Sequence, residues 1–308
     1  MLNQAIAIAN GKGGVGKTSI VANLAAIAAR ADWQVLAVDL DPQGNLGSDL
    51  GYKRADAGDD DGKALARALT NGEELLPPVI GIRPNLDAVP AGAATLALAT
   101  SLQERAQAGG SPADALARAL DPIAEDYDLV VFDCPPGDNV LGDLGLTASR
   151  GLVIPVRFDS GSLDGLELMA NRFARIKRSG VNPHLELLGI ALFDVPVRAT
   201  ALRAQIEAEL ERDFPSGTRI FSTAIRHSQR AAFDMRREGL TAAEYELLAE
   251  KDRANRLELL HQGRAAMRAA GPARSQSASG LADDYLQLSR ELLSVFTALP
   301  PVGALAVS

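Results

Sequence analysis

The residues best suited to chemistry lie in a glycine-rich stretch, Asn10–Ser19, which reads Asn-Gly-Lys-Gly-Gly-Val-Gly-Lys-Thr-Ser. The phosphate-binding pattern G-x-x-x-x-G-K-[ST] is matched in register by Gly11, Gly16, Lys17 and Thr18. Glycines let backbone N–H groups curl around phosphate oxygens at positions where a Cβ would collide. Lys17 can then bridge the outer phosphates, and Thr18 can bind Mg²⁺ directly. The stretch therefore predicts a site for ATP and magnesium.

A strand and a helix must hold this loop if it is to face an anion. Gln4–Ala9 is short and apolar, as a buried strand is. Apolar residues recur at helical spacing after Lys17, at Ile20, Leu24, Ile27 and Ala28. The helix N-terminus, with its partial positive charge, then points at the phosphates. The other interpretation, a flexible surface turn, leaves the flanking strand and helix unexplained.

Two carboxylates, Asp39 and Asp41, follow the second apolar strand, Trp33–Asp39. Strand, helix and strand in close succession form a βαβ unit, whose crossover makes the sheet parallel. Both carboxylates and the loop then lie at the C-terminal edge of the sheet, where such sheets bind ligands. Asp39 and Asp41 could hold hydrated magnesium or position a water. As the structural alternative, either could simply cap a helix or stabilise a turn.

The segment Asp128–Asp133 is apolar on both faces, which predicts a central parallel strand. A third carboxylate, Asp133, is its last residue. It is a candidate magnesium ligand through water. The following Cys134 is more plausible as a small apolar filler than as a nucleophile. Further strands are predicted at Leu86–Val89, Gly151–Val156, Leu187–Phe193 and Arg219–Thr223.

Helices are predicted at Leu65–Leu76, Ala94–Ala106, Ser162–Arg178, Ala201–Arg212 and His227–Glu238, and a helix start at Ser111-Pro112. The exposed side of Ser162–Arg178 is expected to include Arg172, Arg175 and Arg178. The alternation of strands and helices predicts an α/β fold: a doubly wound, mostly parallel sheet flanked by helices, in one domain over residues 1–308.

Composition narrows the class of protein. The chain has 308 residues, of which 47% are hydrophobic and 23% charged, as in an ordinary globular protein. A net charge of −8 excludes a surface coated in positive charge but allows a local basic patch. The single cysteine excludes an internal disulfide framework and a cysteine-rich metal site. Because Met1 leads almost directly into the first strand, we expect no signal peptide or N-terminal DNA-reading module, and a cytoplasmic location.

Lys12 makes the loop more specific, because one lysine already serves the phosphates. Lys-Gly-Gly-Val-Gly-Lys-Thr resembles the deviant Walker A loop of the ParA/MinD family of ATPases. The resemblance implies that Lys12 reaches the nucleotide of a partner subunit in an ATP-bound homodimer, that Asp41 assists hydrolysis, and that Asp39 and Asp133 hold magnesium. The nucleotide-binding set it implies is Gly11, Lys12, Gly13, Gly14, Val15, Gly16, Lys17, Thr18 and Ser19.

Two positions depart from the family. Cys134-Pro135-Pro136-Gly137 resembles switch II, the segment that responds to the nucleotide. Relatives commonly continue with an Asn-Ala-Leu run, whereas this chain has Asp143-Leu144-Gly145-Leu146, and Arg150 replaces a usual aspartate. The resemblance runs from Met1 to about Gly239 and resumes at Leu281–Leu293.

The family implies four possible outputs. The leading one is DNA partition: an ATP-bound dimer binds DNA non-specifically on the nucleoid, and a ParB-like partner protein triggers release. Its candidate DNA contacts are Arg226, Arg230 and Arg237, near one face of a helix, with Arg236 beside them; the alternative is a solvated helix face. A MinD-like membrane role is second, and is disfavoured by the acidic closing helix Asp283–Phe296. An ATP-dependent small-molecule ligase is third, and an iron–sulfur reductase fails for lack of cysteines.

Leu240–Gly280 has no counterpart in compact relatives and is interpreted as an insertion. Leu240–Ala270 is rich in Ala, Leu, Glu and Arg, which predicts one or two helices. Gly271–Gly280 has the composition of a flexible linker. The leucines of Leu240–Ala270 are too many to leave exposed to water, so we expect the insertion to contact a second subunit or a partner.

Overall fold

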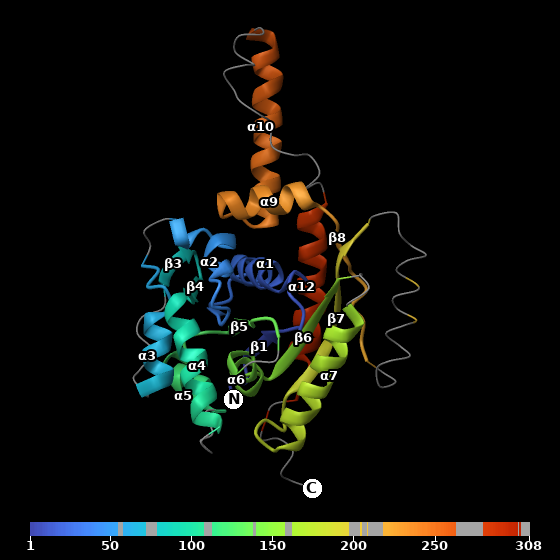
Figure 1. The fold of residues 1–308 in the computed structure, drawn as a ribbon. Coiled ribbons are helices and arrows are strands. Elements are labelled where there is room, and N and C mark those ends of the chain that lie inside the picture. The colour runs from blue at the N-terminus through green and yellow to red at the C-terminus, as the bar shows by residue number, and fades with distance from the viewer. Residues whose placement is uncertain are drawn as a thin grey trace.

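A single eight-stranded sheet forms the centre of the molecule (Figure 1), with strand order β3-β4-β2-β5-β1-β6-β7-β8. The computed structural model describes residues 1–54, 58–71, 79–107, 113–137, 140–157, 162–196, 218–262 and 280–300, with the single residues 204, 208 and 302. The strands are β1 (Ala5–Ile8), β2 (Val35–Asp39), β3 (Val79–Arg83), β4 (Leu86–Val89), β5 (Leu129–Asp133), β6 (Gly151–Arg157), β7 (Glu186–Val195) and β8 (Ile225–Arg226). Each neighbouring pair is parallel except β3 with β4.

Both faces of the sheet are buried, as the unbroken apolar strands predict. In β1, Ala5 and Ala7 face one hydrophobic cluster, and Ile6 and Ile8 face the other. The first cluster is covered by α3 (Lys63–Asn71), α4 (Ala93–Gln107), α5 (Ala115–Ala124), α6 (Val140–Ala148) and α7 (Ser162–Arg178). The second is covered by α1 (Lys17–Arg30), α2 (Asn45–Asp49), α9 (Gln229–Glu238), the start of α10 (Ala242–Gln262) and α12 (Leu281–Thr297). The doubly wound α/β prediction is confirmed.

The last part of the sheet differs from the prediction. Arg219–Thr223 is no regular strand, since only an isolated bridge joins Ile220 to Ile190. The edge strand is β8, and α9 begins at Gln229, after Ser228. Arg226 therefore lies on a strand, and its placement on one helix with Arg230 was wrong. Serine and histidine between them favour a turn over a helical first turn.

Other elements match in type and differ at their ends. The helix predicted at Leu65–Leu76 is α3, described as Lys63–Asn71, and Ala94–Ala106 is α4. The strand β3, which the sequence analysis did not predict, pairs antiparallel with β4 through a turn at Asn85, whose φ is 61°. The helix start at Ser111-Pro112 lies outside the described residues, as do most of the predicted helix Ala201–Arg212 and most of the linker Gly271–Gly280.

The segment after Gly239 has two unlike parts. Helix α10 rises from the body, with its N-terminal end next to α9 (Figure 1). Tyr245 in its first turn is fully buried, whereas Leu247 is 53% exposed. Its base therefore belongs to the core, whereas Leu247, two residues further on, lies on the opposite face of the helix. No helix in the described part of the chain has the length and hydrophobicity to cross a bilayer.

Candidate nucleotide-binding site

The loop between β1 and α1 needs glycine at two positions. Gly14 and Gly16 have φ of 74° and 88°, a region that residues with a Cβ rarely adopt. A Cβ on Gly16 would also overlap the ring of Phe193 at the end of β7. Helix α1 begins directly afterwards, at Lys17. The loop thus presents the helix N-terminus at the C-terminal edge of the sheet, as the motif predicts.

Asn10 fixes the loop from behind. Its Nδ2 donates to the carbonyl of Pro155 on β6 over 2.6 Å, and its Oδ1 accepts from the Lys12 N–H at 2.9 Å. The Gly11 carbonyl accepts from the N–H of Gly137 at 2.8 Å. The loop is therefore tied both to a central strand and to the switch II segment. The sequence analysis missed this role of Asn10, because the loop pattern begins one residue later.

Lys17 is held inside its own loop. The side chain is buried, and its Nζ donates to the carbonyl of Lys12 at 2.9 Å. Burial lowers the pKa of Lys17, and the nearby Asp133 carboxylate opposes that shift. The ammonium group thus already lies next to the loop backbone, where an outer phosphate would replace the carbonyl as its partner.

Asp39 and Asp133 lie side by side, because β2 and β5 pair in parallel with these two residues in register. Both are fully buried. Asp39 accepts from the N–H groups of Asp41 and Leu46, whereas neither oxygen of Asp133 accepts a hydrogen bond of normal geometry from the described residues, and the nearby Thr18 hydroxyl and Lys17 ammonium only partly offset the burial of this carboxylate. Burial raises the pKa of Asp133 to about 7 and that of Asp39 well above its usual range. A buried carboxylate without a partner is costly unless a cation neutralises it, so these residues fit a magnesium ion.

Asp41 lies at the mouth of this edge and is 9% exposed. Its Oδ1 accepts from the N–H of Gln43, and its carbonyl accepts from that of Gly44. Gly44 has φ 62°, and a Cβ there would come within 2.8 Å of the Ala91 carbonyl. The turn thus holds Asp41 beside Asp39 through its N–H, its Oδ1 and its carbonyl.

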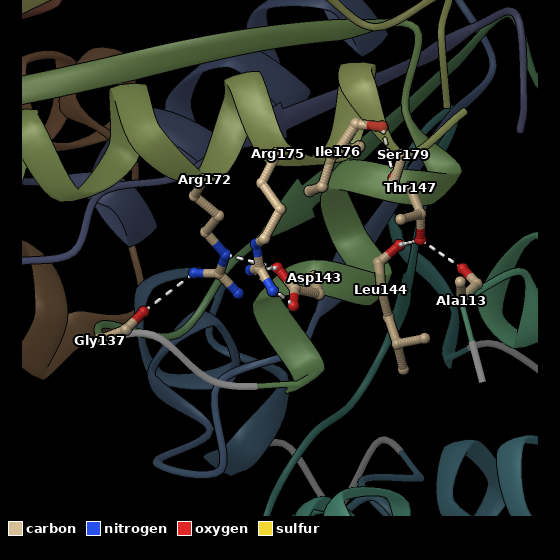
Figure 2. Close-up of polar contacts among 9 residues, drawn as sticks. All are labelled: Ala113, Gly137, Asp143, Leu144, Thr147, Arg172, Arg175, Ile176 and Ser179. Carbon is tan, nitrogen blue, oxygen red and sulfur yellow. Dashed lines mark hydrogen bonds and ion pairs between the residues drawn. The ribbon is translucent and has the colours of Figure 1, made fainter. Parts of the chain in front are cut away.

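The switch II segment is anchored by an arginine that the sequence analysis placed on the surface. Arg172 of α7 is 4% exposed, and it donates through Nη1 to the Gly137 carbonyl at 2.9 Å and through Nε to Asp143 at 2.6 Å (Figure 2). Arg175 reaches the same carboxylate from the solvent side (Figure 2). Asp143, one of the departures from the family pattern, is therefore the anion that these two arginines share.

Cys134 is the apolar filler that the sequence predicts. It is fully buried, and burial raises the pKa of its thiol to about 12. At neutral pH the group is a protonated thiol, which is a poor nucleophile.

The four arginines considered for DNA lie on β8 and α9, and each contacts a carboxylate. Arg226 forms a bidentate pair with Asp284 of α12, with both distances 2.6 Å. Arg236 pairs with Asp49 of α2 at 2.6 Å. Arg230 and Arg237 both contact Asp234, at 3.0 and 3.4 Å.

Comparison with known proteins adds to this geometry. Residues 3–187 match the protein family described as an AAA domain. Chromosome-partitioning ATPase Soj of Thermus thermophilus is 40% identical over 227 residues, which cover 74% of this chain and 82% of Soj. Sporulation initiation inhibitor protein Soj of Bacillus subtilis is 32% identical, covering 73% of this chain and 84% of that protein. Cobyrinic acid a,c-diamide synthase of Mycobacterium smegmatis, solved with an ATP analogue and magnesium, has TM-score 0.62 and 27% identity and covers 76% and 91% of the two chains.

Proposed function

This chain belongs to the ParA/MinD family of P-loop ATPases, and we propose that it is a DNA-partition ATPase whose ATP-bound dimer binds DNA without sequence preference. ATP and Mg²⁺ are its cofactors. The observation that carries the proposal is Lys12 in a loop that otherwise has every phosphate-binding residue, because the general pattern needs only one lysine and the resemblance assigns the second to the nucleotide of a partner subunit.

Each site residue has a proposed task in hydrolysis. Thr18, Asp39 and Asp133 would hold magnesium, which neutralises the charge on the phosphates. Lys17 binds the outer phosphates, and the N–H groups from Gly11 to Ser19 surround them. Asp41 orients the attacking water, and Lys12 of a second subunit adds positive charge, as an arginine finger does. Phosphoryl transfer to water then needs no covalent nucleophile, in keeping with the buried, protonated Cys134.

Requiring Lys12 from a second subunit makes hydrolysis depend on dimerisation. The ATP-bound dimer would persist on the nucleoid until a ParB-like partner protein accelerates hydrolysis, and the nucleotide would act as a timer. The identity of the Soj relatives over most of their length supports a partition role. The arginines Arg226, Arg230, Arg236 and Arg237 are the candidate DNA contacts.

DNA retention in ATP, ADP or no nucleotide, across a salt series, tests this function. ATP-specific binding that weakens steeply as salt rises is expected, because released counterions drive phosphate contacts. Equal retention in all three nucleotide states would contradict the proposal. Asp41→Ala provides a second test: it should keep ATP binding and accumulate a long-lived dimer on DNA. A monomer in saturating ATP, seen by sedimentation, would exclude the water-positioning role.

An ATP-dependent ligase remains the second candidate, because the diamide synthase shares the fold and a MgATP site. The two functions separate in one assay. A partition ATPase hydrolyses ATP faster when DNA and its partner protein are added, whereas a ligase needs a carboxylic acid substrate and an amine donor.

A further inference from the structure

We propose that the outer face of α9 binds duplex DNA through a mixed contact, in which the Phe233 ring meets sugar or base edges between two phosphate-binding arginines, Arg230 and Arg237. This inference rests on the proposed DNA binding and adds an apolar component to it. The surface formed by these three residues is called the α9 stripe below.

The spacing of the α9 stripe places its members on one face of the helix. Phe233 follows Arg230 by three residues and precedes Arg237 by four, the intervals at which helical side chains are neighbours. The guanidinium carbon of Arg237 lies 5.9 Å from the centre of the Phe233 ring. At about 1.5 Å per residue, the two arginines are roughly 10 Å apart along the axis. This is the spacing of their backbones; the two guanidinium groups come closer together, because both contact Asp234, and the ring of Phe233 lies beside the guanidinium group of Arg237. The two cations and the ring therefore form one compact cluster on the outer face of α9.

Phe233 packs against Arg237 on the outside of α9 and takes no part in the hydrophobic core. Its side chain is 62% exposed, whereas Ala231 and Met235 on the opposite face of α9 are buried in the core. An aromatic ring left in water between two arginines fits a ligand that offers anions and flat apolar edges together. Nucleic acid has that combination: apolar side chains can enter the minor groove, and arginines contact the phosphates.

The charges around the α9 stripe are layered. The side chains of Arg230, Arg236 and Arg237 are 61%, 47% and 54% exposed. Their carboxylate partners lie underneath, with Asp234 at 3%, Asp49 at 10% and Glu238 at 22%. The layer that a ligand meets first is therefore cationic, although the whole chain has a net charge of −8.

Asp234 is the positioning residue of the α9 stripe. It accepts from Arg230 Nε at 3.0 Å and from the hydroxyl of the fully buried Tyr245 at 3.1 Å, and it lies 3.4 Å from Arg237 Nη2. The buried Tyr245 thus fixes the position of the Asp234 carboxylate, and this carboxylate attracts both guanidinium groups. Arginines fixed before binding lose less conformational entropy when they meet phosphates.

The test compares duplex DNA affinity in ATP for the wild type, Phe233→Ala, Phe233→Trp and Arg230→Gln, measured by fluorescence anisotropy at several salt concentrations. Leu96→Ala is the matched control, because Leu96 is an apolar residue of α4 with a similar exposure, 61%. Phe233→Ala should weaken binding by about fivefold or more, because the apolar area that the ring buries against the DNA is lost. Phe233→Trp should retain binding, and Leu96→Ala should match the wild type.

The salt dependence separates the two components of the contact. Arg230→Gln should lower the slope of log affinity against log salt by about one, because one phosphate contact is lost. Phe233→Ala should leave that slope unchanged, because an apolar contact releases no counterions. Wild-type affinity in Phe233→Ala overturns the inference and leaves the proposed function standing. Failure of the wild type to bind DNA in ATP overturns both.

A second copy of this chain could cover the α9 stripe instead. Sedimentation of Phe233→Ala in ATP decides this: the dimer should form as in the wild type. Loss of the dimer in parallel with loss of DNA binding would make Phe233 a contact between subunits, and the inference would fall.

Discussion

The charged groups of the nucleotide site and of the α9 surface differ in whether they have partners within the chain. At the nucleotide site, Asp133 is fully buried, and its oxygens accept no hydrogen bond of normal geometry from the described part of the chain. On α9 and β8, all four candidate arginines contact a carboxylate of the same chain. The first region needs a cation from outside. In the second region the arginines already have anionic partners, although Asp234 Oδ1 accepts no hydrogen bond from the described residues, so DNA must replace existing ion pairs.

The two regions differ in what a missing ligand would cost the protein. A buried charge without a partner costs several kcal/mol, so its presence points to a missing ligand. An exposed ion pair contributes only about 0–1 kcal/mol, so it neither requires nor excludes one. The affinity of α9 for DNA must therefore come from exchanging weak pairs for phosphate contacts, aided by the exposed ring of Phe233.

The largest effect concerns the base of α10, which joins the α9 surface to the core. Replacing Leu240–Gly280 by a short Gly/Ser loop removes the buried Tyr245 and the Glu244 that pairs with Arg83 at 2.7 Å. Replacing only residues 248–279 keeps both. We expect the longer replacement to lower the free energy of unfolding by about 5 kcal/mol or more, because a buried aromatic ring and an ion pair are lost.

The shorter replacement should stay folded and bind ATP, with a change only in dimer lifetime or partner-stimulated turnover. Thermal unfolding and nucleotide binding measured on both variants provide the comparison. A shorter variant that unfolds would show that the whole segment is core, and would contradict its interpretation as an insertion.

The second effect separates the two lysines of the nucleotide site. Lys17→Ala should weaken ATP binding by about 100-fold or more, because a buried charge partner of the phosphates is lost. Lys12→Ala should keep ATP binding measurable and remove dimerisation and hydrolysis. Isothermal titration and sedimentation in ATP measure the two properties. An equal loss of ATP affinity in both variants would contradict a role of Lys12 across the subunit interface.

The sequence predicted where the candidate nucleotide-binding residues lie in the fold, because the signals for that placement are local. The glycines that adopt positive φ and the strands that end in aspartate can each be recognised from a few neighbouring residues. The βαβ rule then brings Asp39 and Asp133 to one edge of the sheet. The fold class follows from the same alternation of elements. Long-range contacts left no such local signal, so the pairing of β3 and the role of Asn10 were missed.

The arginines were misplaced for the same reason, because their long-range contacts leave no local signal in the sequence. Helical spacing alone placed Arg172 on the solvent face of α7, whereas Gly142 leaves room for its guanidinium and Asp143 attracts it inward. Arg226 was assigned to a helix because the two residues between β8 and α9, His227 and Ser228, include no glycine or proline to signal the turn. Which carboxylate an arginine meets depends on tertiary packing, which no periodicity encodes.

A smaller effect is expected from Asp133→Asn in protein freed of nucleotide and metal. Burial raises the pKa of Asp133 to about 7. A carboxyl with a raised pKa stabilises the fold fully below its unfolded pKa, and this stability is lost as pH rises through about 7. Between pH 5.5 and 8 the wild type should therefore lose about 2 kcal/mol through this group.

Asp133→Asn should flatten that pH dependence, and MgATP should flatten it in the wild type, because a bound cation stabilises the ionised carboxylate. Denaturant unfolding in a chelator at the two pH values measures both. If the variant loses stability with pH as steeply as the wild type does, Asp133 is not the group responsible. The variant should also bind ATP with a weaker dependence on magnesium.

The smallest effect would connect the two regions through α2, which follows Asp41 in the chain. Asp49 accepts from Ser19 of the phosphate loop at 3.3 Å and pairs with Arg236 of α9 at 2.6 Å. Because Arg236 is 47% exposed, Asp49→Asn should change the free energy of unfolding by only about 1 kcal/mol or less. The variant frees the guanidinium of Arg236 from its anion, so DNA binding without nucleotide should strengthen slightly, and the gap between the ATP and nucleotide-free states should narrow. Arg236→Gln should weaken DNA binding in ATP, and in the double variant Asp49→Asn should have no further effect. If Asp49→Asn lowers ATP affinity instead and leaves DNA binding unchanged, the carboxylate serves the phosphate loop alone, and the two regions are not joined at this pair.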